Sequence, residues 1–214
     1  DDRTSRGLGD VYKRQLRRLE YRGYDSAGVA FKKNGTIDVV KNAGRVEQLA
    51  KKLKLKENST NLGIAHTRWA THGVPSEKNA HPHSSKDIFI VHNGIVENHE
   101  ELKAQLRSEG MRFSSQTDSE VIAHLVQYYV EKGQSFEKAV FNTIKKLKGA
   151  YALGILNKKE PEQLIGIRNQ SPLVLGKGFQ ENFIASDVMA LAPVTNKFIY
   201  LDDGQVAIIN KTKL

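Results

Sequence analysis

Cysteine is absent from all 214 residues of the chain. Disulfide bonds and thiolate-ligated metal sites are therefore excluded within it, although a count of zero does not reveal the redox compartment. Long apolar runs are also missing, since none approaches the roughly 18 residues of a membrane-spanning helix. No charged start followed by an apolar stretch marks a secretory signal. We therefore expect a cytoplasmic protein that makes no contact with a membrane.

Tryptophan occurs only once, but the composition is otherwise that of an ordinary globular protein, with 39% hydrophobic and 27% charged residues. The formal net charge of +9 permits contact with nucleic acid or with anionic metabolites. The lysines, however, are scattered rather than interleaved with aromatic residues, and no nucleic-acid-binding motif accompanies them. We expect a solvated basic surface and no nucleic-acid partner.

Residues 1–15 differ from the rest of the chain in their sequence pattern. They show neither helical nor strand periodicity, and the text "GDVYKRQ" resembles mistranslated adaptor or vector sequence. We predict a non-native leader over 1–15, the alternative being a genuine disordered leader, and one domain over 16–214. Because the sequence stops straight after a strand-like run, we expect this domain to be incomplete at both ends.

From residue 16 onward the pattern is orderly. A helix is expected to end in a glycine-bearing turn within 16–28, and Asn34-Gly35 predicts a hairpin within 29–41. Helical spacing of apolar residues predicts helices over 44–54, 98–110, 117–133 and 135–149, with Asn98 and Ser135 as caps. Short apolar runs predict strands within 62–73, 87–94, 150–157, 163–169, 172–178, 182–186 and 205–210. This order favours a layered α+β domain.

Polar residues follow two of these strands, where sites are commonly built. Arg68 is the only charged residue of its stretch, and its planar guanidinium fits a carboxylate, although a surface ion pair is the alternative. Asn93-Gly94 is either a tight turn or an oxyanion hole, in which an amide and a backbone N–H face a developing negative oxygen. Asp118 is either a helix-capping acid or an anion that binds an ammonium group.

The histidines and the single tryptophan are weaker signals. His81 and His83 flank a proline, but the spacing supplies no third ligand, so we expect no metal site. Trp69 is expected to be a core or loop-anchoring aromatic residue, with a place along a substrate path as the alternative.

Seven motifs, in one order, resemble the amino-terminal, glutamine-hydrolysing domain of the glucosamine-6-phosphate synthase family. They are "RRLEYRGYDSAG", "IAHTRWATHG", "NAHPH", "VHNGIVENHEELK", "TDSEVIAHLV", "LKGAYAL" and "ENFIASD". The resemblance runs from about residue 16 to residue 214, and its first two motifs favour this family over the amidophosphoribosyltransferases.

The resemblance implies a four-layer α/β/β/α sandwich of the N-terminal-nucleophile, class II glutamine amidotransferase type. It also implies a reaction without a cofactor, in which an N-terminal cysteine attacks the side-chain amide of L-glutamine and releases ammonia and then glutamate. Sugar-phosphate isomerase domains that follow in the family use the ammonia to convert fructose 6-phosphate to glucosamine 6-phosphate, and a homo-oligomer is expected to form through them.

By the same resemblance, Arg68 binds the α-carboxylate of glutamine and Asp118 its α-ammonium group, while Asn93 and the Gly94 N–H form the oxyanion hole. The remaining expected site residues lie on a loop that closes over glutamine or on the wall beside the nucleophile. They are Trp69, Thr71 and His72 for the loop, and Arg22 and Gly23 for the wall.

One departure from the family is plain. The opening strand with its nucleophilic cysteine has no counterpart in residues 1–15, so we predict that this chain cannot hydrolyse glutamine and that it has an unpaired sheet edge. Two alternatives stay open. One is the glutaminase domain of another class II amidotransferase, and the other is a non-catalytic module that binds glutamine.

Overall fold

The computed structural model describes residues 8–54, 60–211 and 213, without the side chains of residues 8–13, Arg22 and Lys54. Part of the predicted leader therefore lies outside the described residues. The rest of it, from Leu8 onward, belongs to helix α1, although no helical periodicity was expected there. The helix is held at its other end by Leu16, which is buried, so tertiary packing decides the conformation. Whether residues 1–15 are native stays a prediction.

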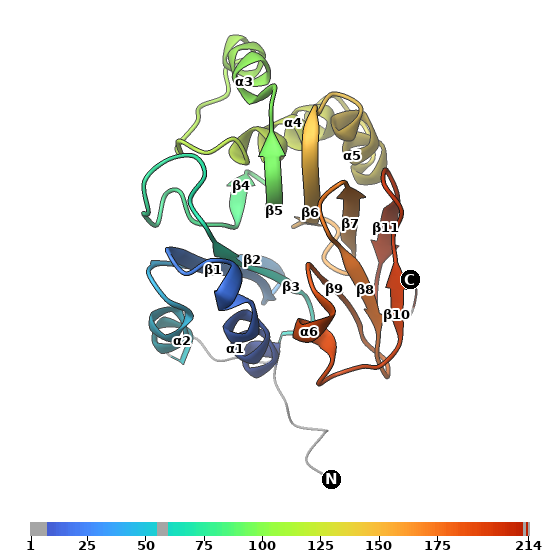
Figure 1. Cartoon of the computed structure of the whole chain (residues 1–214). Coiled ribbons are helices and arrows are strands. Elements are labelled where there is room, and N and C mark those ends of the chain that lie inside the picture. Colours follow the sequence, from blue (N-terminus) through green and yellow to red (C-terminus); the bar gives the residue numbers. More distant parts are fainter. Residues whose placement is uncertain (1–7, 55–59, 212, 214) are drawn as a thin grey trace.

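The helices are α1 (Leu8–Leu19), the short 3-10 helix η1 (Glu20–Arg22), α2 (Val46–Lys54), α3 (His99–Ser108), α4 (Glu120–Glu131), α5 (Phe136–Ile144) and α6 (Val188–Leu191). The strands are β1 (Ser26–Lys33), β2 (Thr36–Ala43), β3 (Gly63–Arg68), β4 (His83–Ser85), β5 (Ile88–Val96), β6 (Gly149–Asn157), β7 (Leu164–Asn169), β8 (Val174–Lys177), β9 (Asn182–Ala185), β10 (Phe198–Tyr200) and β11 (Val206–Ile209). Figure 1 shows their arrangement along the chain.

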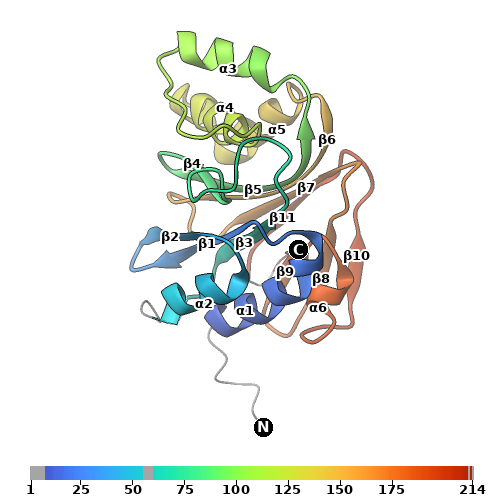
Figure 2. The same ribbon diagram turned by 60° about the vertical axis from the view of Figure 1, so that its left-hand side comes forward.

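Four layers stack on one another in Figure 2, as expected for an α/β/β/α sandwich. Helices α3, α4 and α5 cover a five-stranded antiparallel sheet of order β11-β7-β6-β5-β4. The next layer contains two three-stranded sheets, β2-β1-β3 and β10-β8-β9, and helices α1, α2 and α6 lie beneath it. Among the described residues, no helix is both long and apolar enough to cross a membrane.

Three hydrophobic clusters fill the spaces between the four layers. One packs the helices α3–α5 against the five-stranded sheet, with Leu106, Ile122 and Leu153 at its centre. A second joins the two strand layers, and a third joins the β1–β2 hairpin to α1 and α2. The alternation of buried side chains along strands and helices therefore places each element in its layer.

Local signals explain most element boundaries. Asn34 and Gly35 both have positive φ, at 48° and 76°, which is the type I′ geometry expected for the β1–β2 hairpin. The Ser135 side chain accepts from the Lys138 N–H and caps α5, as predicted. Asn98 stands at the start of α3, but its predicted capping bond is absent because its side-chain amide binds the backbone of the segment before β6.

The second strand layer is not continuous. Within the described part of the chain, β3 pairs only with β1, and β9 pairs only with β8, so each strand has one open edge. An unpaired edge was expected from the sequence. That a native strand is missing from this place stays a prediction.

Candidate active site

A cavity of about 690 Å³ lies between β3 and β9 and extends along the length of both strands. Residues of β5 and β6 line one side, and Leu16, Leu19 and Ala190 line the side toward α1 and α6. This volume falls within the range of small-molecule binding sites. Most of the predicted site residues line the cavity, namely Arg68, Trp69, Thr71, His72, Asn93, Gly94 and Asp118.

Asn93 and Gly94 lie inside β5, opposite Ala152 and Tyr151 of β6. The tight-turn interpretation is therefore wrong, because the ladder with β6 carries β5 on to Val96. Gly94 has a φ of +124°, and a Cβ at this position would lie 2.0 Å from the Ala150 carbonyl oxygen. Only glycine fits such a close approach, so the backbone conformation beside Asn93 depends on it.

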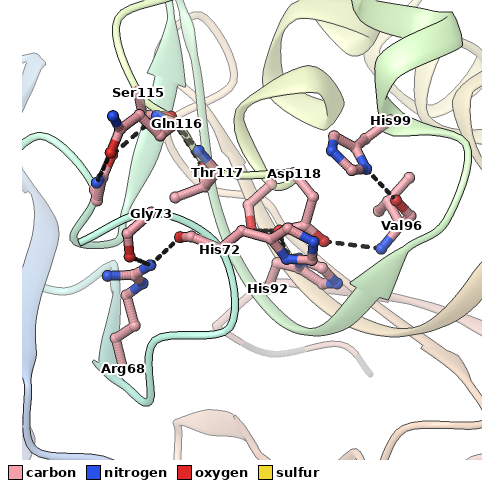
Figure 3. Close-up of polar contacts among 12 residues, drawn as sticks. Arg68, His72, Gly73, His92, Val96, His99, Ser115, Gln116, Thr117 and Asp118 are labelled. Carbon is pink, nitrogen blue, oxygen red and sulfur yellow. Dashed lines mark hydrogen bonds and ion pairs between the residues drawn. The ribbon is translucent and has the colours of Figure 1, made fainter. Parts of the chain in front are cut away.

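Arg68 ends β3 and is only 4% exposed, so the surface ion pair considered from the sequence is wrong. Its Nη2 donates to the backbone carbonyls of His72 and Gly73, the latter at 3.0 Å. Figure 3 shows the guanidinium beneath this loop. Its Nη1 makes no hydrogen bond and lies 3.7 Å from Asp25 Oδ1. Burial lowers the pKa of Arg68, which the carboxylates of Asp25 and Asp118 oppose.

Asp118 is buried and precedes α4 without capping it. Its Oδ2 accepts from the backbone N–H of Val96 at 2.8 Å, at the end of β5, so the predicted capping role is wrong. Its Oδ1 lies 3.9 Å from His72 Nδ1, and Figure 3 shows the two side chains next to each other. The carboxylate thus lies where the loop after β3, the end of β5 and the start of α4 meet. It supplies a negative charge on the cavity wall.

The loop after β3 carries the exposed part of the site. Trp69 is 62% exposed and contacts the ring of Tyr24 edge-on, with 6.0 Å between centroids, so of its two expected places, in the core or as a loop anchor, the core is wrong. His72 packs against the ring of His99. Gly23 packs against the backbone at the start of this loop, since a Cβ there would come within 2.4 Å of the Arg68 carbonyl carbon, and it does not line the cavity. The side chain of Arg22 lies outside the described residues.

Four histidines form a cluster at the cavity, and they were not assigned to a site from the sequence; His66, His81 and His92 line the cavity, and His83 lies next to them. The ring of His81 lies 4.2 Å from that of His66 and 4.6 Å from that of His83, measured between centroids. Burial lowers the pKa of His66 and of His92 to about 4 and that of His83 to about 3, so all are neutral at pH 7. One signal was available, since His66 lies two residues before Arg68 and therefore on the same face of β3.

The described residues hold no cluster of three or more side chains arranged to bind a metal ion. The histidines instead bond to hydroxyl groups and an amide. His92 Nδ1 lies 2.8 Å from Ser119 Oγ, and His83 Nε2 lies 3.1 Å from Thr117 Oγ1. His66 Nε2 lies 2.7 Å from Asn93 Oδ1. The cluster therefore braces both the 117–119 segment and the amide of Asn93.

Comparison with known sequences identifies the family of the chain. A profile described as a glutamine amidotransferase domain matches residues 66–193. Glutamine–fructose-6-phosphate aminotransferase (isomerizing) of Acinetobacter baylyi is 48% identical over 211 residues, which are 99% of this chain and 34% of that protein. The enzyme of the same name from Escherichia coli K12 is 48% identical over 97% of this chain and 34% of its own length. The chain thus spans about a third of these relatives.

Comparison with solved structures extends the agreement to the fold. The glutamine phosphoribosylpyrophosphate amidotransferase of B. subtilis superposes with a TM-score of 0.80 at 24% identity, over 97% of this chain and 46% of that one. At this identity the likeness concerns the fold alone. Together with the profile match over the segment that carries Arg68, Asn93 and Asp118, it shows that the chain belongs to the glutamine amidotransferase domain family and has the N-terminal-nucleophile fold.

Proposed function

We propose that the cavity between β3 and β9 binds L-glutamine. The observation that carries this proposal is the placement of a buried cation, a buried anion and an amide beside Gly94 on the walls of one cavity. Arg68 offers a planar cation for the α-carboxylate, and Asp118 offers a negative charge for the α-ammonium group. The Asn93 amide and the Gly94 N–H then face the side-chain carboxamide oxygen.

The complete protein, on this proposal, uses the domain to release ammonia from glutamine for the formation of glucosamine 6-phosphate from fructose 6-phosphate. The names of the relatives support this acceptor over that of another class II amidotransferase. Sugar-phosphate isomerase domains are the partners that we infer for it, together with a homo-oligomer formed through them. A cytoplasmic location also stays a prediction.

Hydrolysis requires a nucleophile that this chain does not contain. In the proposed reaction a terminal cysteine thiolate attacks the carboxamide carbon, and its own α-amino group, with a pKa near ~7.7–8.0, serves as the base. The 214 residues contain no cysteine. We therefore propose that this chain binds glutamine without cleaving it, as the non-catalytic alternative also requires.

Calorimetry with the full chain tests the proposal directly. Titration with L-glutamine is expected to show one site, whereas D-glutamine, with its carboxylate and ammonium exchanged, binds at least about tenfold more weakly. An enzymatic glutamate assay on the same sample is expected to show no release. Equal binding of the two enantiomers would contradict the proposed grip of Arg68 and Asp118, and glutamate release would contradict the need for cysteine.

A further inference from the structure

The side-chain amide of Asn93 has two chemically opposite ends, of which only one suits the proposed site. The amide nitrogen donates a hydrogen bond to a carboxamide oxygen, whereas the amide oxygen repels it. Rotation of the amide by 180° exchanges the two ends with almost no change in shape. Something in the structure must therefore fix which end faces the cavity.

His66 contacts one end of that amide. Its Nε2 lies 2.7 Å from Asn93 Oδ1, and no other hydrogen bond fixes the Asn93 side chain among the described residues. A neutral imidazole has one N–H and one bare nitrogen. When Nε2 carries the hydrogen, it donates to Oδ1 and turns the Asn93 nitrogen toward the cavity. In the other tautomer, the bare Nε2 accepts from the amide nitrogen and the oxygen faces the cavity.

The surroundings of His66 favour the first tautomer. Its Nδ1 is buried and forms no hydrogen bond, since the contact of the ring with the His92 backbone, which raises the pKa of His66, lacks the geometry of one. A buried N–H without a partner at Nδ1 costs more free energy than a buried lone pair without one. The hydrogen is therefore expected on Nε2, where Asn93 Oδ1 accepts it. Burial also lowers the pKa of His66 to about 4, which keeps the ring neutral at pH 7.

Packing fixes the ring as well as its hydrogen. His66 lies on β3 opposite Gly28 of β1, and the ring of His81 stacks against it. A Cβ on Gly28 would lie 2.1 Å from the His81 carbonyl oxygen, so the His81 backbone passes directly over β1 at this point. The imidazole is thus in contact with the His81 ring on one side, while its Nε2 contacts the Asn93 amide.

We propose that His66 is a positioning residue whose Nε2–H holds the Asn93 amide with its nitrogen toward the carboxamide oxygen of bound glutamine. This inference rests on the proposed function. It assigns His66 no contact with glutamine. Its effect is confined to the carboxamide end of the ligand, because the amino-acid end is bound by Arg68 and Asp118.

A ligand pair separates positioning from general structural support. L-Norvaline has the α-carboxylate, the α-ammonium group and the chain length of glutamine but no carboxamide. We expect His66→Phe to weaken L-glutamine binding about tenfold, the effect of one lost hydrogen bond, and to leave L-norvaline binding within about twofold. His66→Gln, which supplies an N–H of its own, restores the preference for glutamine. His83→Phe, which alters another histidine of the cluster, leaves this preference unchanged.

The outcomes distinguish the two proposals. If the unaltered chain does not prefer glutamine over norvaline, the proposed function fails and the role of His66 with it. If it does, but His66→Phe weakens both ligands equally or neither, only the positioning role is overturned. Nitrogen-15 NMR of the unaltered chain at pH 7 adds a ligand-free test. We expect the Nε2–H tautomer of His66, and an Nδ1–H tautomer would overturn the inference whatever the binding data.

Discussion

The carboxylate of Asp118 accepts a hydrogen bond from the backbone N–H of Val96 at 2.8 Å, and in this way joins the start of α4 to the end of β5. The same side chain lies on the cavity wall. One carboxylate therefore has a structural bond and, on the proposed function, a charge that the ligand uses. Two substitutions separate these roles.

Asp118→Asn retains an oxygen that accepts from Val96 but removes the negative charge. We expect little change in the free energy of unfolding and a loss of about 2 kcal/mol or more in glutamine binding, which calorimetry measures. Asp118→Ala leaves the buried Val96 N–H without a partner, so the free energy of unfolding falls by about 1–3 kcal/mol in urea titrations. Unchanged glutamine affinity in Asp118→Asn would remove this residue from the site.

Arg68→Lys retains the charge and loses the planar fork. The ammonium group of lysine cannot bind the carbonyls of the 72–73 loop and a ligand carboxylate in the same geometry. We expect glutamine affinity to fall at least about tenfold and proteolysis within the loop to become faster. Arg107→Lys, an exposed position on α3, is the matched control and leaves both unchanged.

Gly94→Ala is expected to be strongly destabilising, because the new Cβ meets the Ala150 carbonyl and the φ of +124° disfavours any side chain. Gly110→Ala provides the control, since Gly110 also has positive φ, at +87°, but open space around its Cβ position. Urea unfolding is expected to show a loss of about 1–2 kcal/mol for Gly110→Ala and a clearly larger loss for Gly94→Ala. Equal losses would show that the close approach in β5 relaxes freely.

Acid is expected to destabilise the fold through three histidines whose pKa values are lowered by loss of contact with solvent. The folded pKa values of His66, His83 and His92 lie below the ordinary 6.5, at about 4, 3 and 4. Between pH 6.5 and about 4 the unfolded chain therefore binds more protons than the folded one. The stability is fully present above pH 6.5 and falls as the pH drops, by up to about 1.4 kcal/mol per pH unit for each histidine.

Urea midpoints at pH 7.5 and pH 5.5 measure this loss. His83→Phe removes one of the titrating rings, so the urea midpoint of this variant is expected to change less between the two pH values.

Glu120 contributes to the pH dependence of stability at lower pH. Although burial opposes it, the contact with His124 Nε2 at 3.5 Å and hydrogen bonds from Ser114 and Ser115 lower the pKa of Glu120, and this contribution is lost only below the ordinary range of a carboxyl group. A midpoint that is flat across pH 5.5–7.5 would contradict the histidine prediction.

The sequence predicted elements that have strong local signals. The Asn34-Gly35 hairpin and the Ser135-capped helix formed as expected, because turn chemistry and capping act over a few residues. The three-residue strands β4 and β10 were missed, since so short a strand shows no periodicity and owes its state to a neighbouring strand.

The site residues also divide into those that the sequence predicted and those that depend on contacts between distant segments. Arg68, Asn93 and Asp118 were found through motifs and do line one cavity. The turn at Asn93-Gly94 and the cap at Asp118 were wrong because strand pairing with β6 and the distant N–H of Val96 override local preference. His66 was missed because its proposed role depends on Asn93, 27 positions away, whereas the local pattern shows only that it shares a face of β3 with Arg68.

The open edges of β3 and β9 have a consequence for solvent access at the centre of the molecule. Their outward-facing amides meet a cavity, where water can reach them, whereas β6 is paired on both sides. Deuterium uptake measured by mass spectrometry is therefore expected to be fast for peptides over 63–68 and 182–185 and slow over 152–156. On the proposed function, glutamine bound in the cavity is expected to slow the uptake over 63–68 most, so deuterium uptake would report binding without any turnover.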